Sequence, residues 1–201
     1  EGHLYFTDPT YGLVNKKDME ISGKELNHSG VYMIKADYLQ HSLEMGEPTA
    51  YVRLVESKRS HPNALAFSPD FSKMYIANSD KGNTFLNVYD VSDDGSLLRG
   101  RLFFNGSELW RKDCEAASNQ QCHETGPIDG IKVDIHGNVF ASGPGGVLII
   151  SPDGALLGRI HLDRPVSNVA FGGDGRMYIT AKDIVARMWV KTKPARIFHK
   201  I

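Results

Sequence analysis

The sequence has 201 residues, of which 41% are hydrophobic and 23% are charged, and its formal net charge is −1. This composition is typical of a globular protein and excludes a disordered or membrane-embedded chain. No run of Lys and Arg is present, so we expect neither nucleic acid nor a membrane as a partner.

The chain opens with the pattern of a turn that runs into a strand. Residues 1–6 read EGHLYF, a start in the middle of a fold, so any targeting segment could have been lost. A single domain of this length is ordinary. We therefore expect one domain over residues 1–201, incomplete at its N-terminus.

One phrase occurs four times along the chain: a polar or glycine turn, one residue, an aliphatic residue, an aromatic residue and a small or apolar continuation. Such short runs, bounded by Gly, Asp, Asn and Pro, predict strands. No long segment has the spacing of an amphipathic helix. The four copies are Gly2–Thr7, Ser72–Ala77, Gly137–Ser142 and Gly175–Thr180.

A second phrase, an Asn or Asp followed by an apolar strand and a turn, precedes three of these copies. Its copies are Asn63–Asp70, Asp129–Asp134 and Asn168–Asp174. A third strand follows each pair, at Gly30–Ile34, Leu86–Asp90, Gly146–Ile150 and Ile184–Val190. Asp-Gly turns introduce outer strands at Leu97–Phe104 and Ala155–Leu162.

Units of four strands, repeated every 40 to 70 residues or so, predict a β-propeller. The alternative is that turn–strand phrases simply recur, as they do in any all-β protein. It explains less well why two linked phrases recur in a fixed order. In a propeller the first strand of each blade lines the central channel, so Asn63, Asp129 and Asn168 are predicted to occupy equivalent positions that face the axis.

Two insertions interrupt the repeat, at 15–29 and 105–125, and Ser107–Gln121 is predicted to be no more than a short helix on a loop. Cys114 and Cys122 lie in the second insertion, where they could form a disulfide or remain two unpaired surface thiols. With the glycosylation tripeptides at Asn27 and Asn105, a disulfide would favour a secreted over a cytoplasmic protein.

Several runs closely resemble the gluconolactonase/regucalcin (senescence marker protein) family, and the resemblance covers almost the whole chain in order. The runs are Tyr5–Gly12, Pro62–Asp70, Asp129–Asp134 with its Gly-Pro-Gly-Gly-Val continuation at 143–147, and Asn168–Gly173. The resemblance implies an all-β fold, a six-bladed β-propeller. This chain would supply about four of those blades, the C-terminal two-thirds.

The resemblance also implies a divalent metal ion in the central channel. Asn63 and Asp129 fall on two of the family's metal ligands, and Asp129 also on its base or nucleophile. The family's glutamate ligand from the first blade is absent from this chain. Ala64 and Ile128 differ from the family's usual glycine and proline, but neither change removes an oxygen donor. Hard oxygen donors favour Ca²⁺, with Mg²⁺, Mn²⁺ or Zn²⁺ as alternatives.

The predicted activity is hydrolysis of sugar lactones, with the metal polarising the lactone carbonyl and Asp129 acting on the attacking water. Asp8, Asn168 and His123 are the predicted substrate contacts, and His61 is interpreted as a solvated loop histidine. Taken without the resemblance, the two residues are better explained as Asx side chains that satisfy backbone donors at strand starts, Asn63 in one strand and Asp129 in the other.

Two alternatives remain open: a non-catalytic propeller that binds calcium or a partner, and a related ester or organophosphate hydrolase. If the native protein started at Glu1, the interpretation of this chain as an enzyme would fail.

Overall fold

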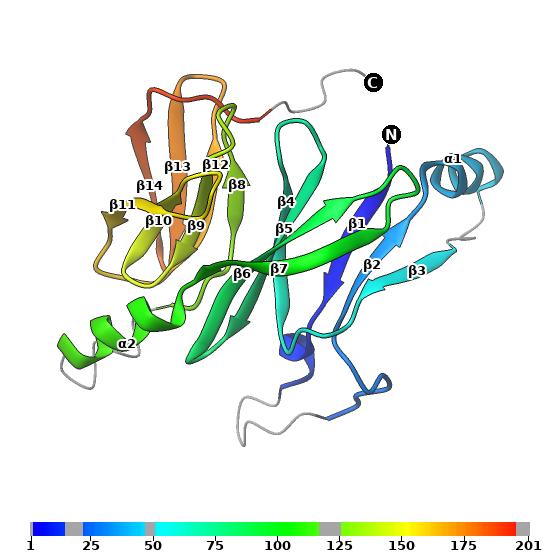
Figure 1. Ribbon diagram of the computed structural model, residues 1–201, viewed down its shortest axis with the longest axis horizontal. Coiled ribbons are helices and arrows are strands. Elements are labelled where there is room, and N and C mark those ends of the chain that lie inside the picture. The colour runs from blue at the N-terminus through cyan, green and yellow to red at the C-terminus, as the bar shows by residue number, and fades with distance from the viewer. Residues whose placement is uncertain (1, 15–21, 47–50, 117–125, 196–201) are drawn as a thin grey trace.

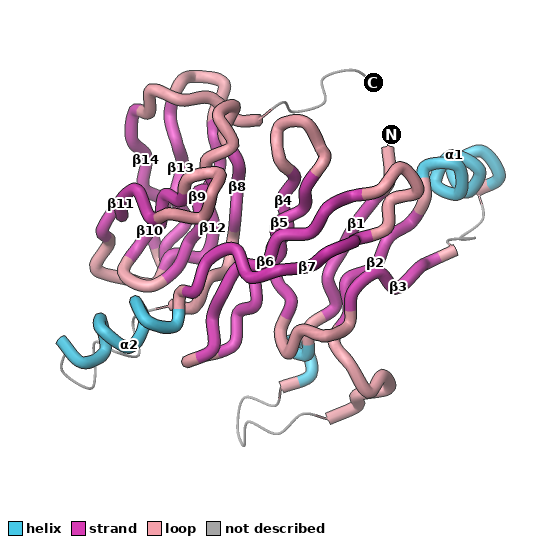
Figure 2. The backbone as a smooth tube through the Cα atoms, in the orientation of Figure 1, coloured by secondary structure: helices cyan, strands magenta, loops and turns pink. Residues whose placement is uncertain are grey.

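The computed structural model describes residues 2–14, 22–46, 51–116 and 126–195, and within them the chain is almost entirely β-structure (Figures 1 and 2). The strands are β1 (Leu4–Asp8), β2 (Gly30–Ile34), β3 (Val52–Glu56), β4 (Pro62–Phe67), β5 (Lys73–Asp80), β6 (Asn83–Val91), β7 (Leu97–Asn105), β8 (Ile131–Val133), β9 (Val139–Gly143), β10 (Gly146–Ile150), β11 (Leu156–His161), β12 (Val166–Phe171), β13 (Arg176–Ala181) and β14 (Ile184–Trp189). The helices are the 3-10 helix η1 (Thr10–Leu13) and the α-helices α1 (Ala36–Met45) and α2 (Ser107–Ala116).

The strands form four separate antiparallel sheets, in chain order β1–β3, β4–β7, β8–β11 and β12–β14. Within each sheet, consecutive strands are neighbours, which is the meander expected of propeller blades. β1 belongs to the phrase that occurs four times, so among the described residues its sheet has no strand that corresponds to the second phrase, the one that begins with Asn or Asp. The all-β prediction is confirmed; the count of six blades stays a prediction.

Local turn chemistry explains why the strands reverse where they do. In the turn after β4, the Ser68 hydroxyl donates a 2.6 Å hydrogen bond to Asp70. After β6, Ser92 donates a bond of the same length to Asp94, and Gly95 follows with φ +79°. Asp side chains that accept local bonds close tight turns, and Gly adopts positive φ without strain. The repeated Ser-x-Asp pattern therefore sets the ends of the strands.

The core lies between neighbouring sheets. Each of the three interfaces, between the first and second sheets, the second and third, and the third and fourth, is filled by one cluster of buried apolar residues. Met74 and Ile76, which are almost fully buried, lie in the first interface. Leu148 lies in the second interface and Met177 in the third. Because each sheet packs against its neighbours in sequence, the order of the blades follows the order of the chain.

The two α-helices lie outside these interfaces (Figure 1). α2 begins where the sequence predicted a short helix. α1 was not predicted, because its ten residues are too few to show a clear helical period. Cys114 in α2 is disulfide-bonded, and the sequence's other cysteine, Cys122, lies outside the described residues.

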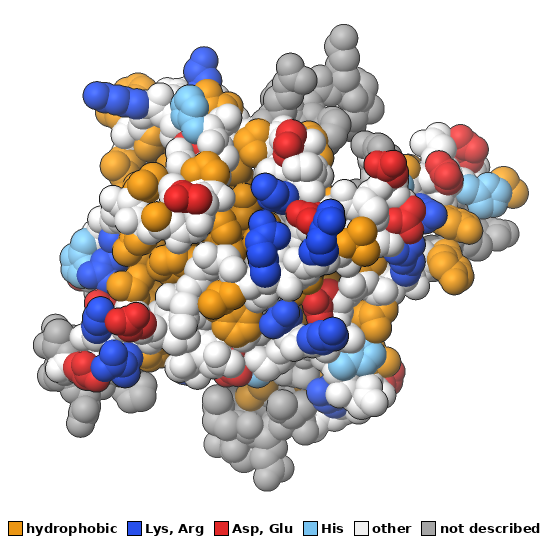
Figure 3. Space-filling view, viewed as in Figure 1, with side chains coloured by type: hydrophobic (Ala, Val, Ile, Leu, Met, Phe, Trp, Pro, Cys, Tyr) orange, Lys and Arg blue, Asp and Glu red, His pale blue; other side chains and the backbone are white. Residues whose placement is uncertain are grey.

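Surface character differs between the sheets. Lys and Arg side chains gather over β6 and β7, and apolar side chains gather over the last two sheets (Figure 3). On β14, Val185 and Trp189 are 69% and 67% exposed. None of the helices in the described ranges is long and apolar enough to cross a membrane.

Candidate active site

Asn63 and Asp129, the two predicted metal ligands, contact each other. The Asn63 side-chain amide (Nδ2) donates a 2.7 Å hydrogen bond to the Asp129 carboxylate (Oδ1). Asn63 is the second residue of β4, at an irregularity of the pairing between β4 and β5. Asp129 lies two residues before β8, and both side chains are half-buried. The contact joins two adjacent sheets at one rim.

The surroundings of Asp129 favour its protonated form. Burial raises the pKa of the Asp129 carboxyl, and the hydrogen bond from Asn63 opposes this by a smaller amount. A carboxylate with little solvent and one neutral donor retains the capacity to bind a cation or accept a proton. A perturbed acid of this kind is a candidate for function rather than for turn formation.

The backbone on both sides of Asp129 is fixed by hydrogen bonds. Ile128 is fully buried; its N–H donates to the Thr84 hydroxyl at 2.7 Å, and its carbonyl accepts from the Ser79 hydroxyl. The Gly130 N–H donates to the Ser142 hydroxyl at 2.8 Å. Since neither flank can move independently, the Asp129 carboxylate is held in a defined position.

Asn168, predicted to face the axis, lies on the far side of Gly130. The Asn168 Oδ1 accepts a hydrogen bond from Lys132 Nζ at 3.2 Å and another from the backbone N–H of Val169 at 2.8 Å. A Cβ on Gly130 would come within 2.4 Å of the Asn168 side chain. Asn168 is thus close to the Asp129 segment, but its oxygen is engaged by Lys132, a residue that the sequence analysis did not identify.

The other two predicted substrate contacts are less informative. Asp8 is the last residue of β1 and is exposed. The pKa of the Tyr32 phenol is raised mainly by its own burial and, to a smaller extent, by the charge of Asp8. No hydrogen bond or ion pair links Asp8 to Asn63 or Asp129 in the described part of the chain. His123 lies outside the described residues.

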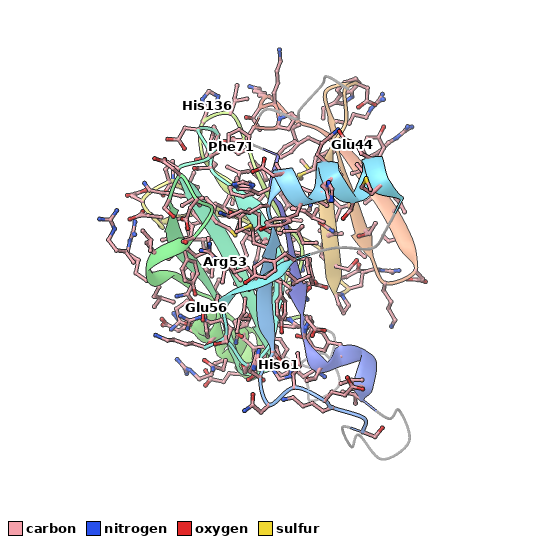
Figure 4. All side chains as sticks on the ribbon, turned by 90° about the vertical axis from the view of Figure 1, so that its right-hand side faces the viewer. Glu44, Arg53, Glu56, His61, Phe71 and His136 are labelled. Atoms are coloured by element: carbon pink, nitrogen blue, oxygen red, sulfur yellow. The ribbon has the colours of Figure 1, made fainter. Side chains whose placement is uncertain are left out.

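His61 is not the solvated loop histidine that the sequence suggested. Its Nδ1 is buried and lies 3.7 Å from the Asp80 carboxylate, and its ring stacks beside Tyr11 with centroids 5.3 Å apart. Figure 4 shows His61 at the end of the molecule where η1 lies. The sequence could not show this, because Tyr11 and His61 are 50 positions apart.

The donor chemistry at this rim fits a divalent cation in part. The Asp129 carboxylate and the Asn63 amide are 2.7 Å apart through Oδ1 and Nδ2, so a rotation of the amide would turn its oxygen toward the same space. The carboxylate and the amide carbonyl are both hard oxygen ligands, the kind that Ca²⁺ and Mg²⁺ require. Among the described residues, no three His, Cys, Asp or Glu side chains gather as a metal site. Asn63 and Asp129 could therefore offer two oxygen ligands to such a cation.

Comparison with known protein families gives a match to the SMP-30/gluconolactonase/LRE-like region over residues 1–183. The chain belongs to this family. The resemblance noted in the sequence is thereby confirmed over nearly its full extent.

Among individual relatives, the chain is 36% identical over 194 residues to a gluconolactonase of Zymomonas mobilis, a match that covers 95% of this chain and 48% of the relative. It is 26% identical over 198 residues to the lactonohydrolase oryL of Aspergillus oryzae, covering 94% and 42%. The chain thus spans about half the length of the curated relatives it matches.

Solved structures show the same fold. A gluconolactonase from Xanthomonas campestris superimposes with a TM-score of 0.68 at 26% identity, over 96% of this chain and 53% of that one. The calcium-binding protein regucalcin from Agrobacterium tumefaciens matches with a TM-score of 0.61 at 18% identity, over 89% and 49%. At 18% identity, the second likeness concerns the fold alone.

Proposed function

We propose that this chain forms part of a metal-dependent hydrolase that opens sugar lactones, with its centre at Asn63 and Asp129. The family, and a relative named gluconolactonase at 36% identity, supply the reaction class. The observation that carries the proposal is the 2.7 Å contact between these two residues. Fold alone would not support a function, because one fold carries many chemistries.

Asn63 and Asp129 would hold the cation through their side-chain oxygens, and calcium fits their hard donor character. When bound, such a cation polarises a carbonyl and stabilises the negative charge that develops on its oxygen. The family resemblance implies a glutamate as a further ligand, and no described residue is assigned that role.

Asp129 is the proposed base. Its half-buried carboxylate accepts a proton from water as the water oxygen forms a bond to the lactone carbonyl carbon. The ring C–O bond then breaks, and the proton passes from Asp129 to the leaving alkoxide, which gives the hydroxy acid. Burial, which raises the pKa of Asp129, makes its carboxylate a stronger base. The rigid backbone around Ile128 and Gly130 keeps the base in place during these steps.

The test is hydrolysis of D-glucono-1,5-lactone by the protein in its natural length, with calcium and after chelation. The wild type is compared with Asp129→Asn, which keeps the shape of the side chain and removes its charge. Asp163→Asn serves as the control, because that side chain is 81% exposed and its hydrogen bond comes from its neighbour Arg164. Loss of turnover only in Asp129→Asn supports the enzyme. Equal turnover in all three would show that Asp129 is not the base. Turnover in none of them would favour a non-catalytic calcium- or partner-binding propeller, and activity on simple esters or organophosphates alone would favour the related hydrolases.

A further inference from the structure

Beside the Asp129 rim lies a pair of rings that the proposed reaction does not use. Tyr11 in η1 and His61 just before β4 lie with ring centroids 5.3 Å apart and planes inclined by 31°. One residue belongs to the end of the first sheet and the other to the start of the second. The two rings therefore form a continuous surface at the junction of two sheets.

The Tyr11 ring is anchored but partly open. Its hydroxyl donates a 3.0 Å hydrogen bond to the carbonyl of Ser79, and its neighbour Thr10 is buried, yet 43% of Tyr11 is exposed. Burial raises the pKa of the Tyr11 phenol to about 12, and the charge of Asp129 acts in the same direction. The phenol is therefore neutral, and its open part is available to a ligand.

The His61 ring is also fixed in one orientation. Its backbone N–H donates to Asn78 Oδ1 at 3.0 Å, and its carbonyl accepts from the Ser79 N–H at 2.9 Å. Nδ1 is buried on the side of Asp80, while 30% of the side chain is exposed. The other ring nitrogen, Nε2, makes no hydrogen bond or ion pair with another described residue, so it can serve as a polar partner for a ligand.

Ser79 connects this pair of rings to the candidate base. Its carbonyl accepts from Tyr11, its N–H donates to the His61 carbonyl, and its hydroxyl donates to the carbonyl of Ile128, the residue before Asp129. His61 in turn lies two positions before Asn63. The rings and the Asn63–Asp129 pair are therefore parts of one rim, held by shared backbone.

We propose that the rings of Tyr11 and His61 bind the sugar-like body of the substrate while its carbonyl lies at Asn63 and Asp129, and that they set the preference for polyhydroxylated lactones. This inference rests on the proposed function. One face of a sugar ring presents C–H groups, which pack on aromatic faces, and its hydroxyls need polar partners such as Nε2. A lactone without hydroxyls would lose the polar contact and much of the contact area.

The experiment compares kcat/KM for D-glucono-1,5-lactone with kcat/KM for δ-valerolactone, which has the same ring and no hydroxyls. Aromatic contacts contribute about 0.5–1.5 kcal/mol, so Tyr11→Ala is expected to lower the ratio of the two constants about two- to tenfold. Tyr11→Phe keeps the ring and loses only the bond to Ser79, so it should retain the wild-type ratio. Tyr38→Ala is the matched control, because Tyr38 in α1 is also 43% exposed and belongs to another aromatic pair.

If Tyr11→Ala does not fold, the same ratio is measured in two other variants. Tyr11→Leu removes the aromatic ring but leaves a smaller gap, and His61→Ala removes the other ring of the pair. An unchanged ratio in folded variants of both residues, or an equal fall in Tyr38→Ala, would overturn the inference while leaving the lactonase proposal intact. Wild-type protein that hydrolyses neither lactone would overturn the proposed function, and the inference with it.

Discussion

The side-chain amide of Asn63 donates a hydrogen bond to the carboxylate of Asp129, a residue 66 positions further along the chain. The bond joins the second sheet to the segment that enters the third. Sheets in this fold contact one another chiefly through apolar residues, so a polar contact between half-buried groups at their junction calls for a specific role.

Asp129→Asn is expected to lower kcat for D-glucono-1,5-lactone by about 10²–10⁴-fold, the range for loss of a general base. The variant keeps the hydrogen-bond geometry to Asn63, so its thermal midpoint should stay close to that of the wild type. Steady-state kinetics with matched melting curves separate the two effects. Turnover within threefold or so of wild type would contradict the assigned role.

Calcium is expected to stabilise the wild type against heat and to have little effect on Asp129→Asn or Asn63→Ala. A ligand at 100 times its dissociation constant adds about 2.7 kcal/mol, which corresponds to a rise of roughly 5–10 °C in a domain of this size. Differential scanning fluorimetry with calcium and with a chelator measures this rise. The same rise in all three proteins would place the cation elsewhere.

Gly130→Ala should destabilise the fold by about 1–3 kcal/mol, the usual cost of inserting a methyl group into a packed site. The added Cβ would lie 2.4 Å from the Asn168 side chain and 2.6 Å from its Cα, so the strands on either side would have to separate. Gly158→Ala is the control, because nothing lies within 4 Å of its Cβ position in β11. Urea unfolding of both variants gives the comparison, and equal stabilities would contradict the close approach seen here.

Asp70 should titrate well below the ordinary value of an aspartate. Hydrogen bonds from the Ser68 hydroxyl and then from Ser72 lower the pKa of the Asp70 carboxyl from 3.8 to about 2. Because the folded-state pKa is the lower one, the stabilisation is present above pH 4 or so and is lost as the pH falls toward 2. The side chain is largely solvated, so its contribution is below about 1 kcal/mol.

The carbon resonance of the Asp70 carboxyl, followed by NMR across this range, gives the pKa directly. Ser68→Ala should move the pKa of Asp70 back toward 3.8, since the hydroxyl that lowers it most is then absent. A midpoint near 3.8 in the wild type would show that the turn network does not persist in solution.

Much of the fold was predictable because its signals are local. Alternation of apolar and polar residues marks strands, and Ser, Asp and Gly at fixed places mark their turns, so the repeat could be recognised without any contact information. α1 escaped prediction because ten residues are too few to show a clear helical period, and none of them is buried in the core that the strands share.

By itself, the sequence determined that Asn63 and Asp129 occupy corresponding places in a repeated unit, and its resemblance to a family suggested what they hold. Only the tertiary structure decided that the two touch, that Gly130 lies against Asn168, and that Tyr11 lies beside His61. The reason is physical: these contacts join residues from different sheets, and the packing of apolar clusters between the sheets sets their relative positions. Local sequence places each side chain on its strand, whereas the packed core decides which side chains meet.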